Sequence, residues 1–120
     1  METKEVEKLL AEYRRLPSFS DLEEMTVNSV GIGGELPISV AAARNDCEAI
    51  TLLLDNGACI DARGESGYTA LHEAVEQGSV EALDLLLRRG ANKELLNDDG
   101  LTPLDLAVSI DSPLTGRLAG

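Results

Sequence analysis

Residues 69–74, TALHEA, and residues 76–92, EQGSVEALDLLLRRGAN, decide the fold of this 120-residue chain. They predict a short helix that begins at Ala70, a break at Gly78, and a second helix that ends at Gly90. Glycine adopts a left-handed backbone without steric cost, which suits both a tight break and the position just past a helix end. The stretch therefore predicts a helix–turn–helix unit.

The unit recurs with a period of 33 residues. Residues 34–63 and 67–96 share nine identities in thirty pairs, where background composition would yield roughly two. The third copy, residues 100–120, matches residues 67–87 of the second at seven of twenty-one positions. The residues aligned in all three copies include Gly34, Gly67 and Gly100, and Ala41, Ala74 and Ala107. Three repeats of one structural unit follow from this pattern.

Each copy carries its own start and break signals. The predicted starts of the first helices are Pro37, Ala70 and Pro103. Proline suits this position because its fixed φ is helical and its missing N–H would be unpaired there. The predicted breaks are Asn45, Gly78 and Asp111, residue types that tolerate a left-handed backbone. The second helix of the third copy must fit within residues 112–120 beside Pro113 and Gly116, so we expect it to be short or frayed.

The segment before the repeats has a helical pattern of its own. Apolar residues recur at three- and four-residue spacing, which predicts an amphipathic helix over about residues 3–16. These residues are Val6, Leu9, Leu10, Tyr13 and Leu16. Such a helix would cover the exposed side of the first repeat. Ser20 and Glu23 form a capping signal that predicts one further short helical turn.

The motif at 69–92 closely resembles the ankyrin repeat. The resemblance covers about residues 31–120 and implies an all-α solenoid of helix–turn–helix units, with repeats at about 31–63, 64–96 and 97–120. Residues 1–30 then form an N-terminal helical cap and link. The resemblance weakens at both ends, because Leu36 stands where the family has Thr, and Ser39 and Asp105 stand where it has His. Terminal repeats of a solenoid are usually atypical, since one face lacks a neighbour.

The chain is strongly acidic. Its 22 carboxylates and 10 basic residues give a formal charge of −12, and residues 16–87 alone hold 13 carboxylates against Arg44 and Arg63, a net of 2 − 13 = −11. This charge repels nucleic-acid phosphates and anionic lipids and favours a basic protein partner. No apolar run approaches the ~18 residues of a membrane span, and the first residues lack a signal-peptide pattern. The sequence predicts a cytoplasmic monomer that binds neither nucleic acid nor membrane.

The residues that suggest chemistry also have structural interpretations. His72, the only histidine, is a conceivable general base or metal ligand beside Glu73. It occupies the His position of the repeat, where the resemblance implies that the imidazole ties neighbouring turns by hydrogen bonds. A structural zinc needs about four ligands, which one histidine and two cysteines do not supply. Cys47 aligns with the apolar Val80 and is predicted to be a small buried hydrophobe, whereas the exposure of Cys59, in a turn, stays open.

Two glycine-containing loops suggest ligands but have the wrong spacing. GIGG at 31–34 is not followed by the lysine of a phosphate loop. NDDG at 97–100 has Leu95 and Leu106 where a calcium loop needs its first and last carboxylates. The chain has no second histidine that could sit beside a Ser or Cys nucleophile. No pair of carboxylates stands out among the many acidic residues. The sequence therefore predicts no cofactor, no metal and no catalytic activity.

The resemblance implies that a protein partner binds the turn tips and the exposed side of the first helices, which form a concave surface. The corresponding residues here are Glu35, Arg44, Glu65, Ser66, Tyr68, Glu76, Gln77, Asp98, Asp99 and Leu101. Tyr68 is the first of them to test, because aromatic residues are enriched among binding hot spots. Packing of Tyr68 against the next turn is the alternative.

Three functions remain open at this point. The first is a small inhibitor, similar to bacterial ankyrin-type immunity proteins that cover the basic substrate cleft of a toxin enzyme. The second is an adaptor of the eukaryotic type that links two proteins through separable surfaces. The third is an enzyme regulatory subunit with latent hydrolase activity around His72.

Overall fold

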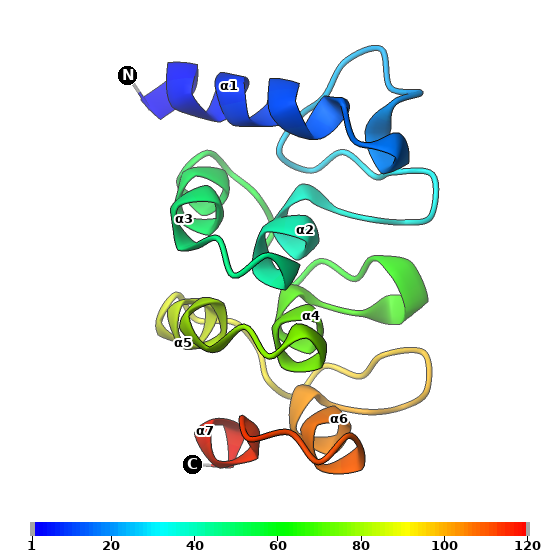
Figure 1. Ribbon diagram of the computed structural model, residues 1–120, viewed down its shortest axis with the longest axis vertical. Coiled ribbons are helices and arrows are strands. Elements are labelled where there is room, and N and C mark those ends of the chain that lie inside the picture. The colour runs from blue at the N-terminus through cyan, green and yellow to red at the C-terminus, as the bar shows by residue number, and fades with distance from the viewer. Residues whose placement is uncertain (1, 120) are drawn as a thin grey trace.

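The computed structural model describes residues 2–119, and all regular structure within that range is helical. In Figure 1, α2, α4 and α6 lie above one another in one column, α3, α5 and α7 in a second, and α1 crosses one end of the stack. The α-helices are α1 (Glu2–Arg14), α2 (Pro37–Ala43), α3 (Cys47–Asp55), α4 (Ala70–Gln77), α5 (Val80–Arg88), α6 (Pro103–Ser109) and α7 (Thr115–Leu118), and the 3-10 turns are η1 (Pro17–Phe19) and η2 (Glu65–Gly67). The predicted all-α solenoid with its capping helix is confirmed.

The local signals of the sequence act where they were expected. The first helix of each repeat begins at the predicted residue, with proline in the first turn of α2 and α6. The breaks that follow have left-handed backbones, with φ of 56° at Asn45, 69° at Gly78 and 54° at Asp111. α7 is only four residues long, which confirms the short final helix expected from Pro113 and Gly116.

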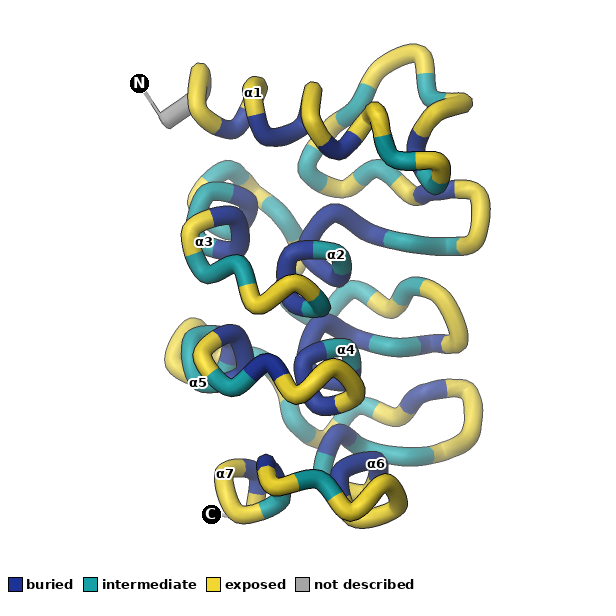
Figure 2. Tube along the Cα trace, viewed as in Figure 1, coloured by how far each residue is buried: buried dark blue, intermediate teal, exposed yellow. Residues whose placement is uncertain are grey.

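Small side chains let the first helices stack closely. Ala41, Ala74 and Ala107 are fully buried where α2 packs against α4 and α4 packs against α6. Leucine, isoleucine and valine supply most of the remaining core, as the low aromatic content requires. Figure 2 shows that the buried segments line the space between the two columns, whereas the turn tips and outer surfaces are exposed.

Polar side chains in the turns join the N-terminal link to the first repeat and the first repeat to the second. In three such bonds a side-chain oxygen accepts from a backbone N–H that lies about one repeat later. They join Asn28 Oδ1 to Cys59 N (3.0 Å), Asn45 Oδ1 to Ala82 N (2.9 Å) and Asp61 Oδ1 to Asn92 N (2.8 Å). The Asn45 bond satisfies a donor in the first turn of α5, whose own N-cap side chain, Ser79, makes no capping bond.

α1 covers the outer side of the first repeat. Val6, Leu9, Leu10 and Tyr13 are buried, and the helix packs against α3. The amphipathic pattern therefore predicts the helix and four residues of its buried face correctly, whereas Leu16 lies just past the helix end and is half-buried.

The further helical turn predicted from Ser20 and Glu23 is wrong. The only helical turn in this link is η1, which precedes Ser20, and residues 20–36 contain no helix. Pro17 begins η1 and the fully buried Phe19 anchors it. Ser20 Oγ donates to the Pro17 carbonyl at 3.0 Å, so this hydroxyl closes the preceding turn instead of capping a new helix.

Candidate functional site

Two adjoining hollows lie where α2, α4 and η2 meet. The first, about 220 Å³, is called the α2–α4 hollow and is lined by Glu35, Ser39, Val40, Ala43, Arg44, Glu65 and Glu73. The second, about 250 Å³, is called the η2–α4 hollow and is lined by Glu65, Ser66, Tyr68, Glu73 and Glu76. Glu65 and Glu73 line both, so the hollows form one continuous acidic surface.

The structure brings six of the ten predicted binding residues to these hollows. They are Glu35, Arg44, Glu65, Ser66, Tyr68 and Glu76. Gln77 is exposed at the end of α4, and Asp98, Asp99 and Leu101 lie in the next turn, outside both hollows. Their assignment to a binding surface stays a prediction.

Glu73 is the one charged lining residue that is missing from the predicted binding residues. It is half-buried, and burial raises the pKa of its carboxyl to about 7, with the negative charges of Glu76 and Glu65 adding to the effect. Glu73 and Glu76 are three residues apart on one helix and therefore share a face. This three-residue spacing is the sequence signal that indicates a shared acidic face.

Tyr68 combines the two roles that the sequence left open. Its ring lies 5.3 Å from the His72 ring at an angle of 34°, so one part packs inside the repeat. The side chain is nevertheless only half-buried and lines the η2–α4 hollow. Burial raises the pKa of the Tyr68 phenol, and the nearby Glu76 and Glu73 raise it further, so the hydroxyl is neutral and able to donate a hydrogen bond at neutral pH.

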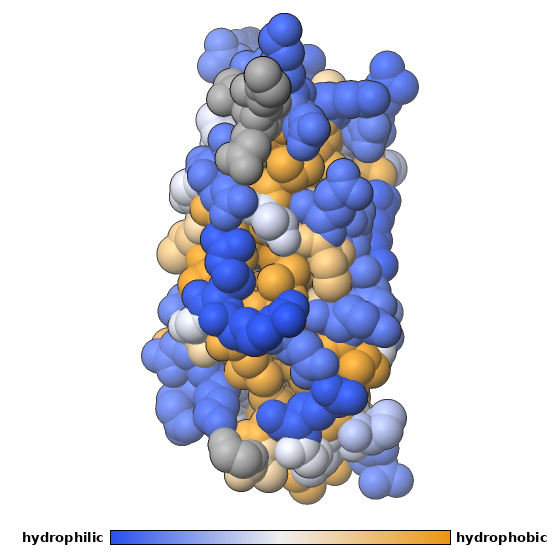
Figure 3. Space-filling view, turned by 90° about the vertical axis from the view of Figure 1, so that its left-hand side faces the viewer, coloured by the Kyte–Doolittle hydropathy of each residue, from blue (hydrophilic) through white to orange (hydrophobic). Residues whose placement is uncertain are grey.

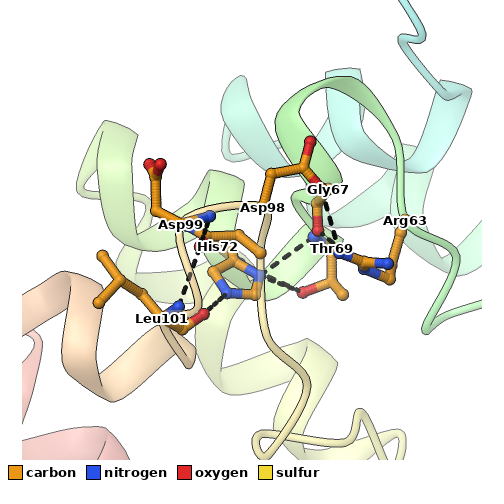
Figure 4. A network of polar contacts seen from close by, with 8 residues as sticks. Arg63, Gly67, Thr69, His72, Asp98, Asp99 and Leu101 are labelled. Atoms are coloured by element: carbon orange, nitrogen blue, oxygen red, sulfur yellow. Dashed lines mark hydrogen bonds and ion pairs between the residues drawn. The ribbon is translucent and has the colours of Figure 1, made fainter.

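His72 is fully buried and bonded at both ring nitrogens. Figure 4 shows the imidazole between Thr69 and Leu101, with Nε2 2.8 Å from the Leu101 carbonyl oxygen. A carbonyl only accepts, so Nε2 carries the proton and Nδ1 accepts from the Thr69 N–H at 3.1 Å and from its hydroxyl at 2.9 Å. Burial lowers the pKa of His72, which keeps the ring neutral. The expected structural role, tying one turn to the next, is confirmed, and no lone pair is left for catalysis or a metal.

The turn after α5 is held in place by bonds of its own. Asn97 Oδ1 accepts from the Asp99 and Leu101 N–H groups at 2.9 and 3.0 Å. The Asp98 carboxylate pairs with Arg63 at 3.2 Å, and the Asp98 N–H donates to the Ser66 carbonyl. Asp98 and Leu101 thus have structural partners within the stack, and Asp99 keeps an exposed side chain.

The cysteines are not a paired or metal-binding set. Cys47 is half-buried, so its prediction as a buried hydrophobe is wrong. It opens α3 on the outer face beside Thr51 and Leu85, where a groove of about 460 Å³ reaches it. Cys59 is exposed. Across residues 2–119, no group of three or more His, Cys, Asp or Glu side chains is arranged to hold a metal ion.

The outer face of the stack differs in character from the inner hollows. Figure 3 shows apolar side chains, in orange, along the middle of this face between rows of hydrophilic residues. In the part of the chain that the structure describes, no helix is both long enough and apolar enough to cross a membrane.

The sequence profile described as ankyrin repeats (3 copies) matches residues 5–97 and 38–113. No curated protein sequence shows significant similarity to the chain.

Proposed function

We propose, from the premise that this chain belongs to the ankyrin repeat family, that it binds a basic protein through the acidic surface around the two hollows. Family membership makes the chain a protein–protein interaction module. The chemistry of the partner is the part that we infer from its residues. A basic surface is the electrostatic complement of an acidic one, and such complementarity speeds encounter and selects the partner.

The observation that carries the proposal is the charge of the two hollows. Four carboxylates line them against a single guanidinium, a net of 1 − 4 = −3 when all are ionised; they are Glu35, Glu65, Glu73 and Glu76, with Arg44. The ion pairs among the described residues lie elsewhere, at Arg63–Asp98, Arg89–Asp55 and Arg117–Asp84. None of these four carboxylates takes part in an ion pair among the described residues.

Within this function we favour an inhibitor or immunity protein that covers the basic substrate cleft of an enzyme. The acidity of residues 16–87, at −11, extends far beyond the hollows and would suit a broad basic cleft. If the captured partner is an enzyme, its activity should fall to zero at one equivalent of the purified chain. An active enzyme in a saturated complex would overturn the inhibitor role and leave the binding role standing.

The experiment begins with capture of partners from the native host on the immobilised chain and their identification by mass spectrometry. The affinity of the purified partner is then measured at 50 and 300 mM NaCl by calorimetry. We expect a basic partner whose Kd rises at least tenfold over this range, because salt screens exposed charges. Glu65→Lys and Glu76→Lys should each weaken binding at least tenfold, and Glu7→Lys on α1 serves as the matched control. A neutral or acidic partner with salt-independent affinity would refute the proposal.

The outer groove gives specific support to one alternative, the adaptor. It is lined on α3 and α5 by Thr51, Leu52, Leu85 and Arg88 among others, and it lies away from the acidic hollows. An adaptor requires two separable surfaces. A protein captured equally well by wild type and by a Tyr68→Ala, Glu76→Lys double variant would favour this alternative. The regulatory subunit with latent hydrolase activity gains no support, because His72 has both nitrogens occupied.

A further inference from the structure

Two residues that line the α2–α4 hollow each have a buried oxygen atom without a hydrogen-bond partner. Ser39, which is 8% exposed, lines the hollow, and its Oγ is buried and unpaired. Glu35 lines the same hollow, and its Oε1 is likewise buried and unpaired. Buried polar atoms are nearly always paired in folded proteins, so two unpaired acceptors in one hollow indicate a missing donor.

The repeat pattern explains why the Ser39 hydroxyl has no partner. Ser39 is the counterpart of His72, one period of 33 residues earlier. In the second repeat the imidazole fills the gap between Thr69 and the Leu101 carbonyl. A serine side chain is too short to span such a gap, and Leu36, the counterpart of Thr69, makes no side-chain capping bond. The position that ties the second repeat to the third therefore carries an unpaired hydroxyl in the first.

The remaining wall of the hollow is acidic, with an apolar floor. Glu65 and Glu73 face it from η2 and α4, and Val40 and Ala43 contribute methyl groups from α2. Arg44 is the only cationic lining residue, and its guanidinium lies over the Tyr13 ring, 5.6 Å from the centroid. That position holds the Arg44 charge toward α1.

We propose that the α2–α4 hollow is a socket for one lysine side chain of the partner, whose ammonium group bonds to Ser39 Oγ, Glu35 Oε1 and the Glu73 carboxylate. An ammonium group is a compact charge with three donors, which matches three acceptors on separate elements. The lysine stem would lie along Val40 and Ala43. Arginine fits less well, because its planar fork is best met by two oxygens of one carboxylate. The inference rests on the proposed function and specifies which partner side chain the acidic surface recognises.

Binding in this socket should strengthen as pH rises from 6 to 8. Burial holds the pKa of Glu73 at about 7, so its carboxylate becomes ionised over this range. The other groups that face it are Glu65 on η2, Glu76 on α4, Glu35 and Arg44 at the two ends of α2, and the Tyr68 phenol. No charged residue of α5 or α6 lines either hollow. An incoming ammonium favours the ionised carboxylate, and ligand binding and proton release are therefore linked.

The test uses the purified chain and a small probe, Nα-acetyl-lysine N-methylamide, followed by amide chemical shifts in NMR spectra. We expect saturable shifts at Ser39, Val40, Glu65 and Glu73, and none with the Nε-acetylated probe. Glu73→Gln should weaken binding at least fivefold and remove the gain between pH 6 and 8. Ser39→His, which places the second repeat's residue in the hollow, should abolish it. Glu12→Gln on α1 is the matched control and should bind as the wild type does.

Several results would overturn the socket while leaving the proposed function intact. They are the absence of saturable shifts in the hollow, shifts confined to the surroundings of Tyr68 and Glu76, and unchanged affinity in both Glu73→Gln and Ser39→His. Tighter binding of the corresponding arginine probe would overturn the choice of lysine. The proposed function fails separately, when the full partner proves not to be basic or binds without salt dependence.

Discussion

His72 and Glu73 are neighbours on α4, and burial shifts their pKa values in opposite directions. For His72 the folded pKa is lowered, so the unfolded chain binds more protons once the pH falls below the usual value near 6.5, and stability is lost there. For Glu73 the folded pKa is raised to about 7, so the folded chain binds more protons between about 4.5 and 7. Stability is therefore lost as the pH rises through that window. The two neighbours partly offset each other in the acidic range.

Replacing Glu73 with glutamine should remove its part of this pH dependence. As the pH rises from 4.5 to 7, ionisation of this carboxyl should destabilise the wild-type chain. At pH 8 the Glu73→Gln variant should therefore be more stable than the wild type by roughly 1–2 kcal/mol. This figure is smaller than the full linkage value because the side chain is only half-buried. Urea unfolding followed by circular dichroism at pH 5 and pH 8 measures both values. Equal stability gaps at the two pH values would contradict the buried-carboxyl account, and Glu12→Gln provides the exposed control.

Replacing His72 with alanine should cost stability and nothing else. The change removes bonds to Thr69 and to the Leu101 carbonyl and leaves a cavity, so we expect a loss of roughly 2–4 kcal/mol in the free energy of unfolding. Asp105→Ala, at the equivalent position of the third repeat, removes an exposed capping bond to Thr102 and should cost only about 1 kcal/mol. Comparable losses in the two variants would show that the cross-repeat bond adds little.

At the scale of residues, the sequence predicts correctly those roles that the repeat motif determines. His72 was correctly assigned because its role belongs to the motif that it completes. Glu73 was missed, because its raised pKa depends on burial beside Glu65, a residue of the preceding turn. Cys47 was misjudged because alignment with Val80 indicates an apolar environment but does not measure how open the outer groove is. Val80 itself is only half-buried.

At the scale of elements, the break between the two helices of a repeat does more than turn the chain. Asn45 has a left-handed backbone, and its side chain reaches the next repeat, where Oδ1 accepts from Ala82 N and Nδ2 donates to Glu81 at 2.7 Å. Asp111 has the same backbone conformation, and its side chain makes no such bond among the described residues. A comparison of Asn45 with Asp111 therefore separates the energetic cost of a left-handed backbone from the stabilisation that the cap provides.

We expect glycine to have opposite effects at these two breaks. Asn45→Gly relieves the backbone but removes the cap of α5, so it should destabilise the chain by about 1 kcal/mol. Asp111→Gly relieves the backbone alone and should stabilise it by a few tenths of a kcal/mol. Thermal unfolding of both variants against the wild type makes the comparison. A stabilising Asn45→Gly would show that the cross-repeat cap is of no consequence.

The helices themselves were predictable, and the link before them was not. Proline, glycine and the apolar periods act locally, which is why the helix starts and breaks were correctly placed. The conformation of the segment after Phe19 depends on the hydrogen bond that the Ser20 hydroxyl makes to Pro17. It also depends on Asn28, whose side chain bonds to Gly57 and Cys59 about thirty residues later. The equivalent bond 33 residues later joins Asp61 to Asn92, but the residue types differ, so no identity in the sequence marks this contact.

At the scale of the whole molecule, repulsion among like charges opposes folding. The chain carries −12, and its three ion pairs among the described residues are at least one-third exposed on one side or both, a class that contributes little. Salt weakens the general repulsion more than it weakens such pairs. We therefore expect the Tm to rise by several degrees between 20 and 300 mM NaCl at pH 7.5, as measured by calorimetry. A falling Tm would mean that the ion pairs outweigh the repulsion.

Three bonds between layers of the stack share one direction along the chain. In each, a side-chain oxygen of the earlier layer accepts from a backbone N–H of the later one, as Asn28, Asn45 and Asp61 show. A repeat that is already folded thus presents a ready acceptor to the segment made after it. During synthesis on the ribosome, where the amino-terminal part emerges first, each finished layer can act as a template for the layer that follows. The direction of these three bonds therefore suits assembly in the order in which the chain is translated.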